Sequence, residues 1–536
     1  MVLKLVSARG IRERPRPARA GPGRRRRVFV REDPAVRIPA RIARLSRECI
    51  WRFTGNGGGA VQPHADASVG TRVAPRGWGS RIATSTAFRL AALAFVVYQI
   101  NLRPVSSADT FPMRYAPISI LTEGDLDFDE FVFLRSHPER TPGLEPGMPY
   151  YLQLRRGHYI STPPLMVAVL ATPVYAIPVW LGLTGDPSEV RAPGDGFTQT
   201  EVVGTLLSKI AASLLIAISV ALVYLSLLHL VPASGARWIT LVYAFSTSSW
   251  AVSSQGLWQT TGSQVLLAGT FLALLEAERR DSRALLALAG ALVALAVMSR
   301  PTAIFFALLI TLYVGQLHGR KLIAFLPAPI VLGALLVSYN LYYFGVLIGG
   351  YAAVTVENVY TWSQVAMGLE GLLVSPNRGL LTFSPVLIAA FVGGVMSFRK
   401  GNAVLLRYLA AGVVASLLYL STMPQWHGQF SFSYRYLVES LPALALLATP
   451  TWQWLTARRW RLGVIGTLAG FSLFVQVVGA FYYPCDWYRS TRSDPAAMAR
   501  FFDWSDLEVV QCLKAGPAES DGLRLIRGLV RRVAER

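Results

Sequence analysis

Asp109 is the residue whose type and position most directly suggest chemistry, because it follows an apolar run ending at Leu102 by about seven residues. A carboxylate so close to a membrane span would lie at the membrane–water boundary, within reach of the head group of an amphiphilic substrate. There it could act as a general base. The surrounding sequence SSADT also suits a turn or a helix cap, so both interpretations of Asp109 stay open.

Three arginines depart from the charge pattern of the loops that are assigned below to the external face. They are Arg300, Arg378 and Arg435, in the segments SRPT, SPNRGLLTFSP and PQWHGQFSFSYRYLVE. A cation on a face that normally lacks basic residues needs an anionic partner, and a phosphate at the lipid boundary would be one. Trp258 and Trp426 lie in the same loops and could stack on sugar rings, although anchoring in the membrane interface explains them equally well.

Acidic residues and a histidine gather in the first external loop. The acids are Asp125, Asp127, Asp129 and Glu130. They alternate with hydrophobic residues, and Glu130 stands where a calcium loop needs glycine, so an EF-hand is excluded and a partly solvated, strand-like edge is expected. His158, in the segment RRGHYISTPPL, could donate to a phosphate or a sugar hydroxyl, or have a structural role only.

The composition is that of a membrane protein. Of the 536 residues, 53% are hydrophobic and 15% are charged, whereas soluble domains have about a quarter charged residues. Most of the net charge of +21 belongs to the first 82 residues, which hold 19 Lys and Arg against 5 Asp and Glu. That basic stretch, rich in Pro, Gly and Ala, predicts a disordered cytoplasmic tail. A nucleic-acid partner is therefore not expected.

Eleven apolar runs predict membrane-spanning helices, although several are shorter than the roughly 20 residues that a bilayer needs. They lie at residues 87–102, 203–230, 237–254, 263–277, 284–298, 302–316, 322–343, 383–398, 404–421, 435–453 and 462–482. The segment 165–183 is also apolar, but it contains Pro173 and Pro178. We expect it to form a juxtamembrane helix on the outer surface.

The distribution of basic residues supports this topology. With segment 165–183 outside the count, the loops on the cytoplasmic side after residue 203 hold eleven Lys and Arg, and the later external loops hold three. Counting the segment as a span would invert every later loop and break the positive-inside rule. The amino terminus is therefore predicted inside and the carboxyl terminus outside. Residues 103–202 form a long first external loop, which is typically functional.

The predicted domains are a cytoplasmic tail at 1–82, a transmembrane domain at 83–482 and a short external segment at 483–536. No C-x-x-C spacing is present, which excludes a zinc or thioredoxin motif. Cys485 and Cys512 both fall in the external segment, where an oxidising compartment permits a disulfide. Whether they are bridged stays open, and Cys49 is expected to remain reduced in the tail.

The order of motifs resembles the GT-C superfamily of polytopic glycosyltransferases over roughly residues 84–482. The motifs are an acid early in the first external loop, GHYISTPPL before a proline-marked helix, SRPT, YNLYYFG with GGY, SPNRGLLTFSP, and WHG followed by SYRYLVE. The chain is most similar to the bacterial branch that includes protein mannosyltransferases and lipid A aminoarabinose transferases. This resemblance implies an all-α integral membrane protein with the GT-C fold.

The resemblance also implies an activity, the transfer of a sugar from a polyprenyl-phosphate donor to a glycan, lipid or protein acceptor at the outer face of a bacterial cytoplasmic membrane. Asp109 would be the catalytic base, and the reaction would invert the anomeric carbon. The residues expected to bind substrate are Arg114, Tyr115, His158, Tyr159, Trp258, Gln259, Arg300, Arg378, Trp426, His427 and Arg435.

The chain departs from many relatives at the acid motif. Asp109 is followed by Thr110 where these have a second acid, and the next external loop offers Gln259, Thr260 and Thr261. No metal ligand is therefore assigned, and dependence on a divalent cation stays open. Two other functions remain, a transporter or flippase of a lipid-linked saccharide and a non-catalytic protein of the same fold. A transporter would predict mid-span charges and internal symmetry, and the sequence has neither.

Overall fold

The computed structural model describes residues 78–104, 107–135, 149–189, 197–351, 361–399, 401–485, 487 and 497–518. The predicted tail at 1–82 lies outside this part of the chain except for its last residues, which already belong to the first helix. The carboxyl-terminal residues 519–536 also lie outside it.

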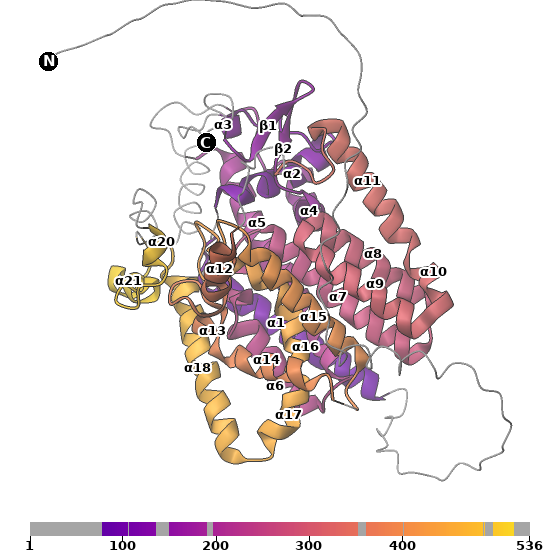
Figure 1. Cartoon of the computed structure of the whole chain (residues 1–536). Helices are drawn as coiled ribbons and strands as arrows, with labels where there is room; N and C mark the ends of the chain where they lie inside the picture. The colour runs from indigo at the N-terminus through magenta and orange to yellow at the C-terminus, as the bar shows by residue number, and fades with distance from the viewer. Residues whose placement is uncertain are drawn as a thin grey trace, which may run out of the picture. The chain divides into compact units, whose positions relative to one another are not determined.

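The described residues are almost entirely helical, as the sequence predicts (Figure 1). The helices are α1 Trp78–Gln99, α2 Phe111–Thr122, α3 Val132–Arg135, α4 Met166–Trp180, α5 Gln199–Leu227, α6 Ala233–Phe245, α7 Gln259–Arg280, α8 Arg283–Ser299, α9 Ile304–His318, α10 Leu322–Phe325, α11 Pro327–Phe344, α12 Trp362–Val374, α13 Leu380–Phe383, α14 Ile388–Met396, α15 Val404–Ser421, α16 Leu441–Leu447, α17 Thr449–Thr456, α18 Arg459–Phe481, α20 Ala497–Arg500 and α21 Glu508–Ala515. The strands are β1 Leu152–Arg155 and β2 His158–Ser161, which form one antiparallel hairpin.

Five helical segments of the described residues are long and apolar enough to cross a bilayer. They are Gln199–Leu227, Pro301–Phe325, Pro327–Phe344, Val404–Ser421 and Arg459–Phe481. The expected number of eleven spans is therefore not confirmed. The run 435–453 is divided into a 3-10 turn, α16 and α17, because Pro442 and Pro450 lie in the first turns of the two helices. The run 237–254 is divided into α6 and a short π-helical turn at Ser249–Ser253.

Close helix packing, as is typical of membrane proteins, rests on small residues at crossing points. The long helix α5 packs against α1 and α7, and α7 packs along α8. A Cβ atom on Gly290 of α8 would lie 2.1 Å from the carbonyl oxygen of Phe325, and one on Gly393 of α14 would lie 1.8 Å from that of Leu447. Only glycine allows these backbones to approach so closely.

The loop at 103–202, which is predicted to be external, contains its own elements among its described residues. Its segment 165–183 forms α4, as predicted, and α4 packs against α2 and α5. The hairpin lies at the same end of the molecule as the carboxyl end of α11 (Figure 1), where Arg156 Nε donates to the Tyr342 carbonyl at 2.8 Å. Lys321 pairs with Asp281, which lies just before the amino end of α8. Two loops that are predicted on the cytoplasmic side therefore contact each other at the end of α8 that lies away from this hairpin.

Candidate active site

Asp109 lies in the single 3-10 turn Ala108–Thr110 between α1 and α2. Pro112 lies in the first turn of α2, where its missing N–H costs nothing, so the chain turns just before it. The Asp109 carboxylate caps neither element. Its Oδ2 accepts a hydrogen bond from Arg435 Nη1 at 2.8 Å, and its Oδ1 accepts one from the Tyr150 hydroxyl at 2.5 Å. The capping interpretation is therefore wrong, and Asp109 is part of a side-chain cluster.

Arg435 reaches Asp109 from the other end of the sequence, as the first residue of the 3-10 turn Arg435–Ser440. Its side chain is 6% exposed, and its guanidinium carbon lies 4.5 Å from the centre of the Trp258 ring. Within the described part of the chain, Arg435 Nε and Trp258 Nε1 are buried donors without a hydrogen-bond partner. Buried donors left unpaired cost about 1–3 kcal/mol each, so this surface favours a ligand that supplies acceptors.

Two tyrosines border the same cluster, and neither was among the residues predicted to bind substrate, although Tyr351 ends the GGY motif. Burial and the nearby Asp109 carboxylate raise the pKa values of Tyr150 and Tyr351 well above the ordinary tyrosine range. Both hydroxyls therefore stay protonated at any physiological pH. Gln259 donates from Nε2 to the Tyr351 hydroxyl at 2.8 Å, which brings this predicted binding residue to the site.

An apolar cavity of about 270 Å³ lies between α4, α8 and α11. Val169 of α4, Met298 of α8 and Leu335 of α11 line it, and so does Tyr351. Leu335 and Val169 are 58% and 42% exposed, so the cavity is open at these residues. We call this cavity the apolar groove.

Arg300 lies behind this site and is not free to bind a ligand in this structure. Its Nη1 donates to the Tyr436 carbonyl at 2.8 Å and lies 3.5 Å from Glu439 Oε1. Thr302 and Ser263 also donate to the fully buried Glu439 carboxylate. Arg300 therefore supports the turn that begins at Arg435. Glu439, which pairs with Arg300, was not among the residues predicted for the site.

Arg378 also makes contacts other than those expected of it. Its guanidinium is 1% exposed and pairs with Glu508 of α21, while its Nε donates to the His427 carbonyl at 3.0 Å. Trp426 and His427 pack against Phe501 of the same carboxyl-terminal segment. Burial, together with the charges of Arg378 and Arg435, lowers the pKa of His427 to about 3, so this histidine is neutral.

Four further residues predicted to bind substrate contact α5 or other parts of the first loop. Arg114 donates to Thr205 at 2.8 Å, and Tyr115 packs against Phe131 within the core. His158 and Tyr159 lie on β2, where His158 Nδ1 is 2.8 Å from Asp129 Oδ2 and the Tyr159 N–H donates to Asp129 Oδ1.

Asp127, Asp129 and His158 bring three potential metal ligands together, with one atom of each within 4.8 Å of the others. The same atoms pair with one another. His158 Nδ1 lies 3.1 Å from Asp127 Oδ2, and the hydrogen bond to Asp129 raises the pKa of His158, which favours its cationic form. The Asp127 bridge to Ile160 confirms the strand-like edge that the sequence predicts for these acids.

Glu130 in the same loop provides a pH-dependent test of this arrangement. Burial raises its pKa from the ordinary 4.5 to about 7, and neither carboxylate oxygen has a hydrogen-bond partner within the described residues. Since the folded state favours the protonated form, its stabilising effect is complete below pH 4.5 and is lost as the pH rises to about 7.

We therefore expect Glu130→Gln to raise stability at pH 8 by about 1–2 kcal/mol, a value reduced for the solvent that still reaches the group, and to change little at pH 4.5. Thermal unfolding of both proteins in detergent at the two pH values measures this. An equal effect at both would show that the carboxylate does not titrate between them.

Solved structures match the fold of this chain at low similarity. ArnT from Cupriavidus metallidurans, bound to undecaprenyl phosphate, matches with a TM-score of 0.44 and 12% identity over 79% of this chain and 70% of ArnT. The apo oligosaccharyltransferase of Archaeoglobus fulgidus matches with a TM-score of 0.46 and 11% identity, over 82% of this chain and 62% of the other. The latter protein in complex with an inhibitory peptide and a dolichol-phosphate matches with a TM-score of 0.38 and 12% identity, over the same shares of 82% and 62%.

The chain thus spans less than two thirds of the length of the oligosaccharyltransferase. No protein-family model and no curated protein matches it. At these scores and identities, the likeness concerns the fold and assigns no activity to the chain.

Proposed function

We propose that this protein transfers a sugar from a polyprenyl-phosphate donor to an acceptor at the outer face of a bacterial cytoplasmic membrane. The observation that carries the proposal is the position of the Asp109–Arg435 pair beside Tyr351, which is one of the residues that line the apolar groove. A carboxylate, a cation and an apolar channel in contact suit a substrate with a hydroxyl, a phosphate and a long hydrocarbon chain.

Arg435 is the residue proposed to bind the donor phosphate. Its guanidinium is buried, and its Nε lacks a partner within the described residues. A phosphate oxygen would satisfy this donor and form a charge-assisted hydrogen bond, which is about twice as strong as a neutral one. Trp258, whose ring lies beneath the guanidinium, has a buried Nε1 that could donate to the same group.

The apolar groove is proposed to hold the first isoprene units of the carrier. Its described lining is mainly hydrophobic, and several of its residues also face the outside of the helices. A hydrocarbon chain could therefore enter it sideways from the membrane. Tyr351 lines the groove and lies close enough to Asp109 and Arg435 for their charges to act on it, so a carrier held there would have its phosphate near Arg435.

Phosphate binding would also release the base. Asp109 accepts hydrogen bonds from Arg435 and Tyr150, which occupy both of its carboxylate oxygens. A phosphate competes for the same guanidinium, so its arrival would weaken the hold of Arg435 on Asp109. The base would therefore become available only when the donor is in place.

The reaction then needs one base and one stabilised leaving group. The acceptor hydroxyl attacks the anomeric carbon and gives its proton to Asp109, while the bond between that carbon and the phosphate oxygen breaks. The electron pair leaves with the phosphate, which Arg435 stabilises. A single displacement of this kind inverts the anomeric carbon. Polyprenyl phosphate is stable as an anion at neutral pH, so no general acid is required.

Native mass spectrometry of the purified protein with polyprenyl phosphate and with the neutral polyprenol of equal length tests donor recognition. We expect the phosphate to bind at least about tenfold more tightly, because a charge-assisted hydrogen bond contributes about 1.5–3 kcal/mol. Equal binding of the two lipids would contradict a phosphate site at Arg435.

The groove can be tested by filling it. We expect Leu335→Trp to weaken polyprenyl-phosphate binding by about tenfold, because an indole would occupy space that the chain needs. Val331→Trp is the matched control, since Val331 is on the same helix and equally exposed, at 58%, but does not line the groove. Titration of both variants with the same lipid measures the difference. Equal affinities of the two variants would mean that the hydrocarbon chain of the carrier binds outside the groove.

A further inference from the structure

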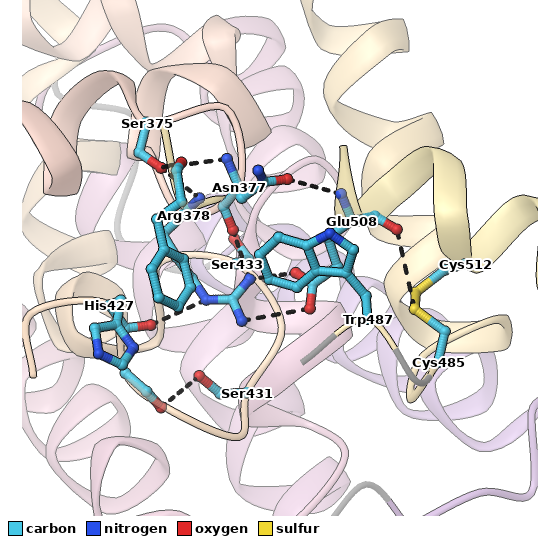
Figure 2. A network of polar contacts seen from close by, with 12 residues as sticks. Ser375, Asn377, Arg378, His427, Ser431, Ser433, Cys485, Trp487, Glu508 and Cys512 are labelled. Carbon is cyan, nitrogen blue, oxygen red and sulfur yellow. Dashed lines mark hydrogen bonds and ion pairs between the residues drawn. A yellow bond between two sulfur atoms is a disulfide. The ribbon is translucent and has the colours of Figure 1, made fainter. Parts of the chain in front are cut away.

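The carboxyl-terminal segment Met498–Gly516 packs on the loops that precede Arg435, although the proposed reaction does not use it. A disulfide between Cys485 and Cys512 attaches α21 to the chain that follows α18. Figure 2 shows this disulfide on one side of Glu508 and His427 on the other, with Arg378 between them. We call this segment the carboxyl-terminal strap.

Asn377 and Ser375 fasten the strap through its main chain. Asn377 Nδ2 donates to the carbonyls of Arg500 at 3.0 Å and Asp506 at 3.1 Å, and its Oδ1 accepts from the Glu508 N–H at 2.7 Å. Ser375 Oγ donates to the Phe501 carbonyl at 2.6 Å. Side chains that bind several main-chain groups fix the position of a segment more firmly than surface contacts do.

Arg378 connects the strap to the loop that leads to Arg435. One part of its guanidinium pairs with Glu508, which is also completely buried, and its Nε donates to the His427 carbonyl at 3.0 Å. The His427 ring stacks on Phe501 at 4.3 Å between ring centres. Glu508 therefore determines the orientation of a guanidinium that holds the main chain of His427.

The loop from His427 to Arg435 is compact, so a shift at one end would reach the other. Ser431 Oγ donates to the Gly428 carbonyl at 2.9 Å, and a Cβ on Gly428 would lie 3.6 Å from Arg435 Cβ. Gln429 and Ser433 have φ angles of 52° and 61°. Non-glycine residues adopt such angles only where their surroundings hold them there.

We propose that Glu508 is a positioning residue, which acts through Arg378 and the His427 main chain to hold the Arg435 guanidinium toward Asp109 and the donor phosphate. The assignment of a phosphate to Arg435 rests on the proposed function. Glu508 itself contacts no substrate. The disulfide keeps α21, and with it Glu508, against Arg378.

Glu508→Gln in the full-length protein tests this role. We expect kcat/KM for the polyprenyl-phosphate sugar to fall by about three- to thirtyfold, as typical couplings through connected residues do, with a rise in KM as part of the change. The donor phosphate carries negative charge in the bound substrate and gains more as the sugar leaves, so a displaced Arg435 raises KM and also lowers kcat. Hydrogen exchange of the peptide covering residues 426–435 should accelerate, while that of α5 should not.

Glu276→Gln is the matched control. Glu276 also forms a salt bridge, with Arg280 at 2.6 Å, but it lies near the carboxyl end of α7, whereas the candidate site is at the amino end of that helix, at Gln259. Loss of one partner from a buried ion pair can prevent folding. The measurements are therefore repeated with a second variant, Cys485→Ala/Cys512→Ala, which removes the disulfide that holds the strap and leaves the Arg378–Glu508 pair chemically intact. The same rise in KM and the same faster exchange at 426–435 are expected.

The outcomes separate this inference from the proposed function. Unchanged KM and unchanged exchange at 426–435 in both variants overturn the positioning role. An equal loss of kcat and kcat/KM, with a lower unfolding temperature and faster exchange throughout, also overturns it, since this is what a purely structural role produces. Faster exchange confined to 426–435, in a protein whose wild type neither binds polyprenyl phosphate nor transfers sugar, supports the positioning of Arg435 and overturns the proposed function.

Discussion

Asp109→Asn should lower the rate of sugar transfer by about 10²–10⁴-fold, the usual contribution of a general base. Asparagine has the same shape and can keep the hydrogen bond from Tyr150, but it cannot take the proton of the acceptor hydroxyl. The measurement is initial transfer rate in proteoliposomes, with donor and acceptor lipids at saturating concentration and equal amounts of folded protein.

The same variant should bind polyprenyl phosphate at least as tightly as the wild type. Asp109 and the phosphate compete for Arg435, so removing the negative charge removes a competitor. Asp186→Asn is the matched control, because Asp186 lies in the same loop at 103–202 and its carboxylate bonds, among the described residues, to the nearby Ser188. Full activity of Asp109→Asn would exclude this residue as the base. Loss of binding together with loss of transfer would make Asp109 a binding group instead.

Arg435→Gln should lower kcat/KM for the donor by about 10²–10³-fold, comparable to removing one donor from an oxyanion-stabilising site. Glutamine removes the charge and most of the donors that face Asp109 and the proposed phosphate. Arg435→Lys should restore part of this activity, since it returns a charge but not the planar set of N–H groups. Steady-state kinetics with a series of donor concentrations measures both variants.

Arg461→Gln provides a close control for Arg435→Gln. Arg461 also lies over a tryptophan, with its guanidinium carbon 4.1 Å from the centre of the Trp454 ring, but it lies in the first turn of α18, at the end predicted on the cytoplasmic side. It should keep wild-type kinetics. If Arg435→Gln also kept them, the phosphate would have to bind at another cation.

Much of the helical architecture could be predicted, because long apolar runs and loop charges leave a local signal. α5, α15 and α18 lie within a few residues of their predicted runs. The run 435–453 was misjudged because its composition is apolar throughout, while Pro442 and Pro450 divide it into separate short helices. A window of hydropathy does not register a proline's effect on backbone geometry.

The candidate site could be predicted only in part. The rule that external loops lack basic residues selected Arg300, Arg378 and Arg435 as a group, but not the member that contacts Asp109. Their partners decide their roles, and these partners are distant in sequence. Glu508 lies 130 residues from Arg378, and Glu439 lies 139 residues from Arg300.

The disulfide illustrates the same limit. The external placement of Cys485 and Cys512 permitted a bridge but could not establish one, because bridging requires their Cα atoms to approach within about 7 Å. In the structure these atoms are 5.1 Å apart. The contact of α21 with α18 that brings them together involves no motif that the sequence displays.

The central claim is that this chain transfers a sugar from a polyprenyl-phosphate carrier, and comparative mass spectrometry of glycolipids and glycans tests it most directly. Cells lacking the protein are compared with cells carrying the wild type or Asp109→Asn at matched membrane levels. We predict that a glycan disappears without the protein, that a polyprenyl-phosphate sugar accumulates, and that only the wild type reverses both changes. An unchanged set of glycans and carriers, or full reversal by Asp109→Asn, would contradict the account.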